Sequence, residues 1–412
     1  MPHPSPLVTQ NPKGSGWVLK ISAVTLCRLV LNTTRRFAYP FAPTLSRGMG
    51  VPLTAVTSII AVNQFTAVPG MFFGPLADRL GYRLMMLAGL GIVVVGMFAG
   101  GFFPVYGVVL GALFLAGLGK SIFDPAIQAY IGQRVPFHRR GLFIGLIEFS
   151  WAGSTLVGIP LTGLLIAAKG WRAPFFAMAG IALIGIVALK ILIPRDETKT
   201  EPYQRTSSFL SAWRKLGRER AALGALGFGF FACAANDNLF VIYGAWLEKS
   251  FDMSIVALGF GTSVIGFAEL SGESLTASIS DRLGLKRAVA SGMALCIICY
   301  IALPFLGQTL FLSLGGLFFI FLTFEFTIVS ALSLCTELLP GLRATMMSGF
   351  LAAAGMGRVA GALIGGSVWI AGGISMTGKV SGVMSGLALA SLIWGLRGWK
   401  SAEIDEGEYG ME

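Results

Sequence analysis

Charged residues are scarce in this chain, and histidine is almost absent. Of 412 residues, 12% are charged, 55% are apolar and two are histidine. A soluble domain carries about 25% charged residues, so this chain has about half the charge that a water-facing surface needs. The composition therefore leaves no room for a soluble domain with a core of its own and predicts a protein embedded in a lipid bilayer.

Residues that bind metals or carry out nucleophilic chemistry are also few. His3 and His138 lie outside the apolar runs, and the five cysteines all lie inside them. Cys296 and Cys299 have the spacing of a redox or metal motif, but no histidine or further cysteine is near them in the sequence, which favours small core residues. We therefore expect no metal, no cofactor and no enzymatic activity.

Twelve apolar runs are long enough to cross a membrane as helices. A spanning helix needs about 20 mainly apolar residues, and these runs lack the alternation of barrel strands. The runs lie at 17–47, 53–77, 83–103, 105–132, 142–168, 173–194, 222–247, 254–280, 286–306, 308–338, 345–371 and 375–398. The predicted fold class is an all-α membrane protein with twelve transmembrane helices.

The positive charges predict which helix ends face the cytoplasm. Lysine and arginine are concentrated in alternate loops and in the stretch 195–220. The other loops hold only Arg47, Lys169, Arg172, Lys249 and Lys379. By the positive-inside rule both termini are cytoplasmic, in a multi-pass protein of the inner (plasma) membrane. The net charge of +11 is spread thinly over these loops, so nucleic-acid binding is not expected.

The chain repeats itself at an offset of 203 residues. At this offset the stretch 74–83 aligns with 277–286, and Gly158 aligns with Gly361. The repeat predicts two pseudo-symmetric six-helix bundles, and parallel repeats of this kind place a binding site at mid-depth between them. The predicted domains are a cytoplasmic tail at 1–16, a bundle at 17–194, a cytoplasmic linker at 195–220, a second bundle at 221–399 and a cytoplasmic tail at 400–412.

The repeated loop resembles a family signature. Residues 74–83 read G-x-x-x-D-R-x-G-x-R, which is similar to the signature loop of the major facilitator superfamily, and a degenerate copy follows at 277–286. The resemblance extends over residues 17–400 and implies the fold of that superfamily, with a likeness to bacterial efflux permeases. One element of its proton-coupled exporters is missing, because Leu113 stands where those proteins carry arginine. The motifs therefore do not establish drug–proton antiport.

The resemblance also implies a cytoplasmic gate. We expect Asp78 to lie at the start of the helix near Thr345, and Asp281 to lie near Gly141, where a helix dipole stabilises a carboxylate by about 0.3–1 kcal/mol. The implied gate residues are Asp78, Arg79, Arg83, Arg140, Asp281, Arg282 and Arg343. The alternative is that these charges only stop the helices from sliding into the membrane.

Charges inside the apolar runs are functional candidates, because each is costly in the membrane unless it is paired or hydrated. The predicted substrate contacts are Arg35, Arg36, Lys120, Asp237 and Arg358. Successive helical residues point about 100° apart, so we expect only one of Arg35 and Arg36 to face a cavity squarely. A salt bridge or a shared water network between one of these arginines and Asp237 is also expected. The alternative is that Lys120 pairs with Asp124 in its own helix and that several acids serve packing alone.

Any coupled proton must be carried by a carboxylate, because no histidine lies in the apolar runs. Burial in a low-dielectric interior favours the neutral form of such a group. Glu269 and Glu325 lie about halfway along their predicted helices, while Glu273 is nearer to the cytoplasmic loop and ranks third. These three glutamates are the predicted proton-coupling residues.

Together these patterns predict a secondary transporter that works by alternating access. Its solute would be small, organic and amphipathic or anionic, with coupling to protons. The runner-up is a proton-driven exporter of cationic lipophilic compounds, and a third hypothesis is a receptor or scaffold of the same fold without flux. The expected partners are a small-molecule substrate, the lipid bilayer and protons, and the chain is expected to act as a monomer.

Overall fold

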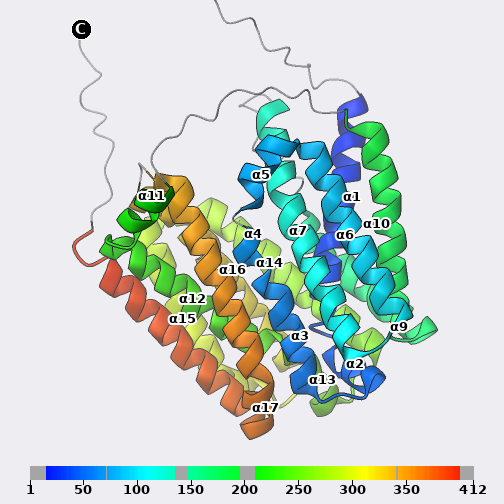
Figure 1. The fold of residues 1–412 in the computed structure, drawn as a ribbon. Coiled ribbons are helices and arrows are strands. Elements are labelled where there is room, and N and C mark those ends of the chain that lie inside the picture. The colour runs from blue at the N-terminus through cyan, green and yellow to red at the C-terminus, as the bar shows by residue number, and fades with distance from the viewer. Residues whose placement is uncertain are drawn as a thin grey trace, which may run out of the picture.

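The computed structural model describes residues 15–70, 72–134, 147, 149–194, 209–339 and 342–399 (Figure 1). These ranges are almost entirely helical and contain no strand, which confirms the predicted all-α class. The helices are α1 (Ser15–Arg36), α2 (Ala42–Met49), α3 (Leu53–Phe65), α4 (Ala67–Gly70), α5 (Phe73–Leu80), α6 (Tyr82–Phe102), α7 (Tyr106–Arg134), the π-helix η1 (Ser154–Gly158), α9 (Ile159–Lys169), α10 (Ala173–Leu192), α11 (Phe209–Leu216), α12 (Arg220–Phe240), α13 (Tyr243–Phe251), α14 (Ile255–Leu283), α15 (Leu285–Leu306), α16 (Leu310–Leu338) and α17 (Arg343–Gly395).

Ten segments among the described residues are long and apolar enough to cross a membrane. Two features reconcile this number with the twelve predicted spans. The long α17 holds two of them, because its backbone breaks at Gly372 and Gly373, and Gly373 adopts the left-handed φ of 58° that favours glycine. The first predicted span corresponds to α1 and α2 together, and the basic residues of α1 lower its hydropathy.

The predicted repeat is visible in the places where helices are interrupted. The chain leaves α1 after Arg36 and enters α2 at Ala42. At the offset of 203 residues, α12 ends at Phe240 and α13 begins at Tyr243. In the first copy Pro40 lies in the interruption, where proline cannot continue a helix because it lacks a backbone N–H. Both halves therefore have a first helix that is interrupted.

The outer surface of the bundle is apolar, as a lipid-facing surface requires. Large apolar side chains on the outer helices are highly exposed, including Ile191 at 77%, Phe305 at 71% and Phe311 at 86%. No soluble protein of this size could present such a surface to water without aggregating. The exposed apolar surface agrees with a chain whose solvent is the bilayer.

The glycines of α17 allow it to pack very closely against α12. A Cβ atom built on Gly357 would lie 2.0 Å from the backbone oxygen of Phe230. One built on Gly361 would lie 2.4 Å from the backbone oxygen of Ala234. Small residues at a spacing of four permit this kind of helix contact in membranes. The glycines at this spacing therefore bring the backbones of α12 and α17 into close contact.

Among the described residues, several contacts between the two halves lie at one end of the molecule. Helix α2 packs on α13, α9 and η1 pack on α14, and α3 packs on α17. At this end, which lies at the bottom of Figure 1, Arg47 of α2 forms an ion pair of 2.6 Å with Glu248 of α13. Gly244 also approaches the backbone oxygen of Pro40 so closely that a built Cβ would lie 2.2 Å from it.

The implied cytoplasmic gate lies largely outside the described part of the structure. This holds for Arg140 and for the side chains of Asp78, Arg79, Asp281 and Arg343. Of the two remaining gate residues, Arg83 donates a hydrogen bond of 2.6 Å to the backbone oxygen of Lys190 in its own half, and Arg282 is exposed. The gate therefore stays a prediction.

Candidate functional site

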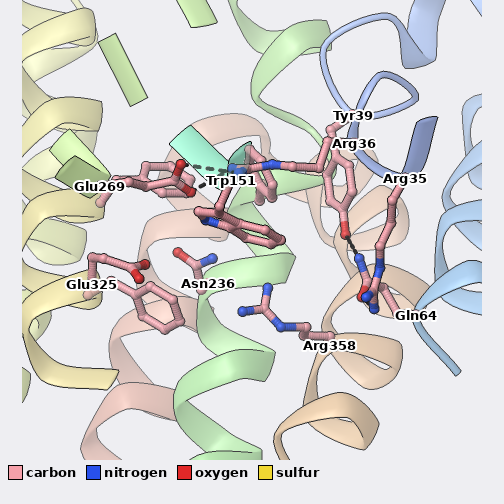
Figure 2. Close-up of a pocket in the computed structure, with 12 residues that line it drawn as sticks. Arg35, Arg36, Tyr39, Gln64, Trp151, Asn236, Glu269, Glu325 and Arg358 are labelled. Atoms are coloured by element: carbon pink, nitrogen blue, oxygen red, sulfur yellow. Dashed lines mark hydrogen bonds and ion pairs between the residues drawn. The ribbon is translucent and has the colours of Figure 1, made fainter. Parts of the chain in front are cut away.

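A cavity lies between the two halves, with an empty volume of about 520 Å³ including the part that opens to solvent (Figure 2). Both interrupted helices contribute to it, together with α3, α14, α16, α17 and the helix that precedes η1. The lining residues are Arg35, Arg36, Tyr39, Gln64, Trp151, Asn236, Phe240, Glu269, Phe321, Phe324, Glu325 and Arg358. This cavity combines guanidinium groups, carboxylates and aromatic rings, the mixture that small-molecule sites use for charge recognition and apolar burial.

Arg35 and Arg36 both line the cavity, and which of them faces it squarely stays a prediction. Both reach the cavity because α1 ends at Arg36 and both arginines belong to its last turn. Their long side chains then diverge around the cavity. Figure 2 shows Arg36 reaching toward Glu269 and Arg35 reaching toward Gln64.

Arg36 and Glu269 form a buried ion pair that joins the two halves. The guanidinium group donates two hydrogen bonds, of 3.2 and 2.6 Å, to the two carboxylate oxygens. Thr155 of η1 adds a longer hydrogen bond of 3.4 Å to the same carboxylate, and the Trp151 ring lies 4.3 Å from the Arg36 guanidinium carbon. Two-pronged geometry of this kind is the strong form of an arginine–carboxylate contact.

A second connection between the halves is a chain of hydrogen bonds. Arg35 donates to the Gln64 amide oxygen. Gln64 donates to the Tyr39 hydroxyl at 2.5 Å, and that hydroxyl donates to Asp237 at 2.8 Å. Arg358 closes the chain with an ion pair of 3.0 Å to the other oxygen of Asp237. Arg35 is therefore connected to the fully buried Asp237 through Gln64 and Tyr39, and the described residues show no salt bridge between these two groups.

Glu325 differs from the other acids of the site. It is half-buried, lines the cavity and makes no hydrogen bond or ion pair within the described part of the chain. Glu325 packs closely against α14 because Gly272 of that helix has no side chain. A Cβ added at Gly272 would lie only 2.8 Å from the Glu325 Cβ. Glu273, which follows Gly272, is half-buried and is not among the residues that line the cavity.

Lys120 lies outside the cavity lining, in a separate polar cluster of the N-terminal half. It is 4% exposed and pairs with Asp124 one turn further along α7, which confirms the alternative of a pair within its own helix. Arg28 contacts the same aspartate at 3.1 Å and donates to the backbone oxygen of Ile147 at 3.2 Å. Both cations of this cluster are buried.

Several lining residues carry no charge, and sequence reasoning did not select them. Gln64 and Asn236 are amides inside apolar runs, so their polarity was an available signal. Tyr39, Phe240 and Phe324 could not be told apart by sequence from the aromatic residues that face lipid. Which aromatic residues line the cavity depends on how each helix is rotated about its axis, and that rotation is set by packing against neighbouring helices.

Known transporters resemble this chain in sequence and in fold. A model of the Major Facilitator Superfamily matches residues 24–361. The MFS-type transporter YceJ of Bacillus subtilis is 28% identical over 72% of this chain and 75% of YceJ. The multidrug resistance protein MdtG of Salmonella typhimurium is 23% identical over 70% of this chain and 73% of MdtG. The crystal structure of a bacterial homologue of the human lysosomal transporter Spinster, inward-facing and unoccupied, shares 14% identity and a TM-score of 0.73 over 93% of this chain and 95% of that one.

Proposed function

This chain belongs to the major facilitator superfamily, and from that membership we propose that it is a secondary transporter that moves a small organic anion with a proton. Membership of a transporter family also means that the chain is a multi-pass membrane protein and not an enzyme. The observation that carries the proposal is the cavity between the halves, where three arginines and two glutamates meet.

The charges around the cavity support coupling between an anion and a proton. Arg36 is balanced by Glu269, and Arg358 is balanced by Asp237. Arg35 has only the neutral Gln64 amide as its hydrogen-bond acceptor, and Glu325 has no ion-pair partner among the described residues. Three positive charges therefore face three negative ones, and protonation of Glu325 leaves one positive charge in excess. Proton and anion then favour each other's binding, because linkage is reciprocal.

Glu325 is the better supported of the two leading proton sites. Protonation of Glu269 would remove the counter-ion of Arg36 and leave that buried guanidinium uncompensated, which is costly. Protonation of Glu325 breaks no ion pair in the described part of the chain. Glu269 then acts as a counter-ion between the halves, and Glu325 exchanges the proton.

The contacts between the halves support an alternating-access cycle. The closed end carries α2 and α13, which the positive-inside rule places away from the cytoplasm. In that orientation the contacts between α2 and α13 close the side of the molecule away from the cytoplasm. The two moving bodies would be residues 17–194 and 221–399, joined by the linker at 195–220, with both termini in the cytoplasm. Asp78 and the other gate residues would close the cytoplasmic side in the opposite conformation.

Transport in vesicles made with the purified protein tests this function. A pH gradient should drive accumulation of an anion that stabilises the protein. Glu325→Gln should abolish this accumulation while exchange of the anion across the membrane continues. The matched control is Glu219→Gln, which removes an exposed carboxylate at the start of α12 and should transport like the unmodified protein. Gradient-driven accumulation that survives in Glu325→Gln would overturn the assignment, and an absence of any flux would favour the receptor or scaffold.

The second candidate is a proton-driven exporter of cationic lipophilic compounds. Its support is Glu325, an acid without an ion-pair partner among the described residues, in a cavity that is also lined by aromatic rings. The similarity to MdtG, a multidrug resistance protein, points in the same direction. A ligand raises the stability of the state that it binds. Stabilisation by lipophilic cations and not by anions would therefore favour this candidate.

A further inference from the structure

Three residues that line the cavity have hydrogen-bond donors without acceptors among the described residues. Arg358 offers five N–H donors, of which one is bonded to Asp237, and 24% of its side chain is exposed to the cavity. Asn236 is 2% exposed and lines the cavity, and its amide nitrogen has no acceptor among the described residues. The Nε atom of Arg35 is buried and has no hydrogen-bond acceptor in the described chain. A buried donor without an acceptor is costly, so this cluster is suited to an acceptor supplied by a ligand.

The charge balance limits that ligand to one negative charge. With Glu325 protonated, the three arginines exceed the ionised Glu269 and Asp237 by a single positive charge. A monoanion neutralises this excess. A dianion would leave an uncompensated negative charge in a largely buried cavity, which costs binding free energy.

The opposite wall of the cavity is aromatic. Phe321 and Phe324 are three residues apart on α16 and therefore lie on one face of that helix, which also carries Glu325. Phe240 of α12 packs edge-on against Phe321, with 5.1 Å between ring centroids. The Arg36 guanidinium carbon lies 4.3 Å from the Trp151 ring centroid and 5.6 Å from the Phe240 ring centroid, and the Phe240 ring is stacked on Tyr39 at 4.2 Å. Phe321 and Phe324 thus provide the wall for a flat apolar body, with Phe240 beside them.

We propose that the substrate is an aromatic monoanion, whose anionic group binds Arg35, Asn236 and Arg358 and whose ring packs on Phe321, Phe324 and Phe240. This inference rests on the proposed function and narrows its substrate class. A pair of aromatic rings has a more favourable interaction free energy than its buried area accounts for, and the difference corresponds to about 2- to 12-fold in affinity. Benzoate should therefore bind more tightly than cyclohexanecarboxylate, although the latter has the same charge and a slightly larger apolar body.

Thermal unfolding of the purified full-length protein measures these affinities, using benzoate, cyclohexanecarboxylate, the dianion phthalate and the cation benzylammonium. Benzoate should stabilise at the lowest concentration, with an affinity about 2- to 12-fold above that for cyclohexanecarboxylate. Phthalate and benzylammonium should have little effect. Equal stabilisation by benzoate and cyclohexanecarboxylate, or stronger stabilisation by phthalate, would overturn the substrate class and leave the proposed anion transport standing. Stabilisation by benzylammonium alone would overturn both.

Two matched variants of α16 test whether Phe324 forms part of the aromatic wall. Phe324→Leu keeps an apolar side chain in the cavity and should bring the affinity ratio of benzoate to cyclohexanecarboxylate close to one. Phe319→Leu changes a side chain of the same helix that is 57% exposed on the outer surface, and it should leave the ratio unchanged. The ratio is taken within each variant, so a change in overall stability does not affect it. An unchanged ratio in Phe324→Leu would contradict the proposed wall.

Discussion

The buried charges of the cavity are fixed by their partners, and Arg36 with Glu269 is the clearest case. The two residues are 4% and 3% exposed, and two hydrogen bonds join them across the halves. Both groups are almost entirely buried, so each is stabilised mainly by the opposite charge of the other. The pair therefore supports the closed contact between α1 and α14 as well as the charge balance of the site.

We expect Glu269→Gln to destabilise the protein by about 3–5 kcal/mol, because it leaves the Arg36 guanidinium buried without a counter-ion. The double variant Arg36→Met with Glu269→Leu should recover much of this loss, since it removes both charges together. Denaturant unfolding in detergent measures the difference. Glu325→Gln is the control, because it breaks no ion pair in the described chain and should change stability little. This account would be contradicted if the loss in unfolding free energy of the double variant equalled the sum of the losses of the two single variants.

Helix packing sets how the elements of the C-terminal half can move. Helices α12 and α17 are in contact along glycines, and at Gly357 the neighbouring backbone oxygen of Phe230 would lie 2.0 Å from an added Cβ. A backbone atom cannot move aside as a flexible side chain can. Because α12 carries Asp237 and α17 carries Arg358, this tight packing also positions the ion pair at the cavity.

Gly357→Ala should therefore push α17 away from α12 and destabilise the protein by about 1–3 kcal/mol, the usual cost of overpacking. The matched control is Gly386→Ala in the second span of α17, where an added Cβ meets nothing within 4 Å. Thermal unfolding of the two variants in the same detergent gives the comparison. Equal unfolding temperatures would show that the close contact is not needed.

On the scale of the whole molecule, the hydrogen bond from Tyr39 to Asp237 joins the two halves beside the cavity. Removing this hydrogen bond to a charged acceptor by Tyr39→Phe should cost about 1.5–3 kcal/mol in the conformation that contains it. The population with α2 against α13 should then fall by about tenfold or more relative to the other conformation. Distances between spin labels on α2 and α13 report this population. Tyr243→Phe is the control, since that hydroxyl bonds Thr262 within one half, and an equal shift in both variants would refute the role of Tyr39.

Much of this architecture could be predicted from the sequence, because hydropathy and the repeat determine the number and order of the helices. The charged candidates Arg35, Glu269 and Arg358 also reached the cavity, since a membrane tolerates such groups only where they are paired or hydrated. Lys120 is also a charged residue inside an apolar run, yet it pairs with Asp124 and does not line the cavity. The reason is that the rotation of a helix is set by packing that the sequence does not reveal. The aromatic wall was missed for the same reason, as Phe321 and Phe324 are two of 31 phenylalanines in the chain.

The measurement that tests alternating access most directly follows two distances in one preparation in vesicles. One spin-label pair joins α2 to α13 at the closed end, and the other joins α5 to the start of α17 at the opposite end. Benzoate is added at a pH low enough to protonate Glu325. We predict that the two distances change in opposite directions, the first increasing as the second decreases. Two distances that increase together, or that both stay constant while the ligand binds, would contradict the account.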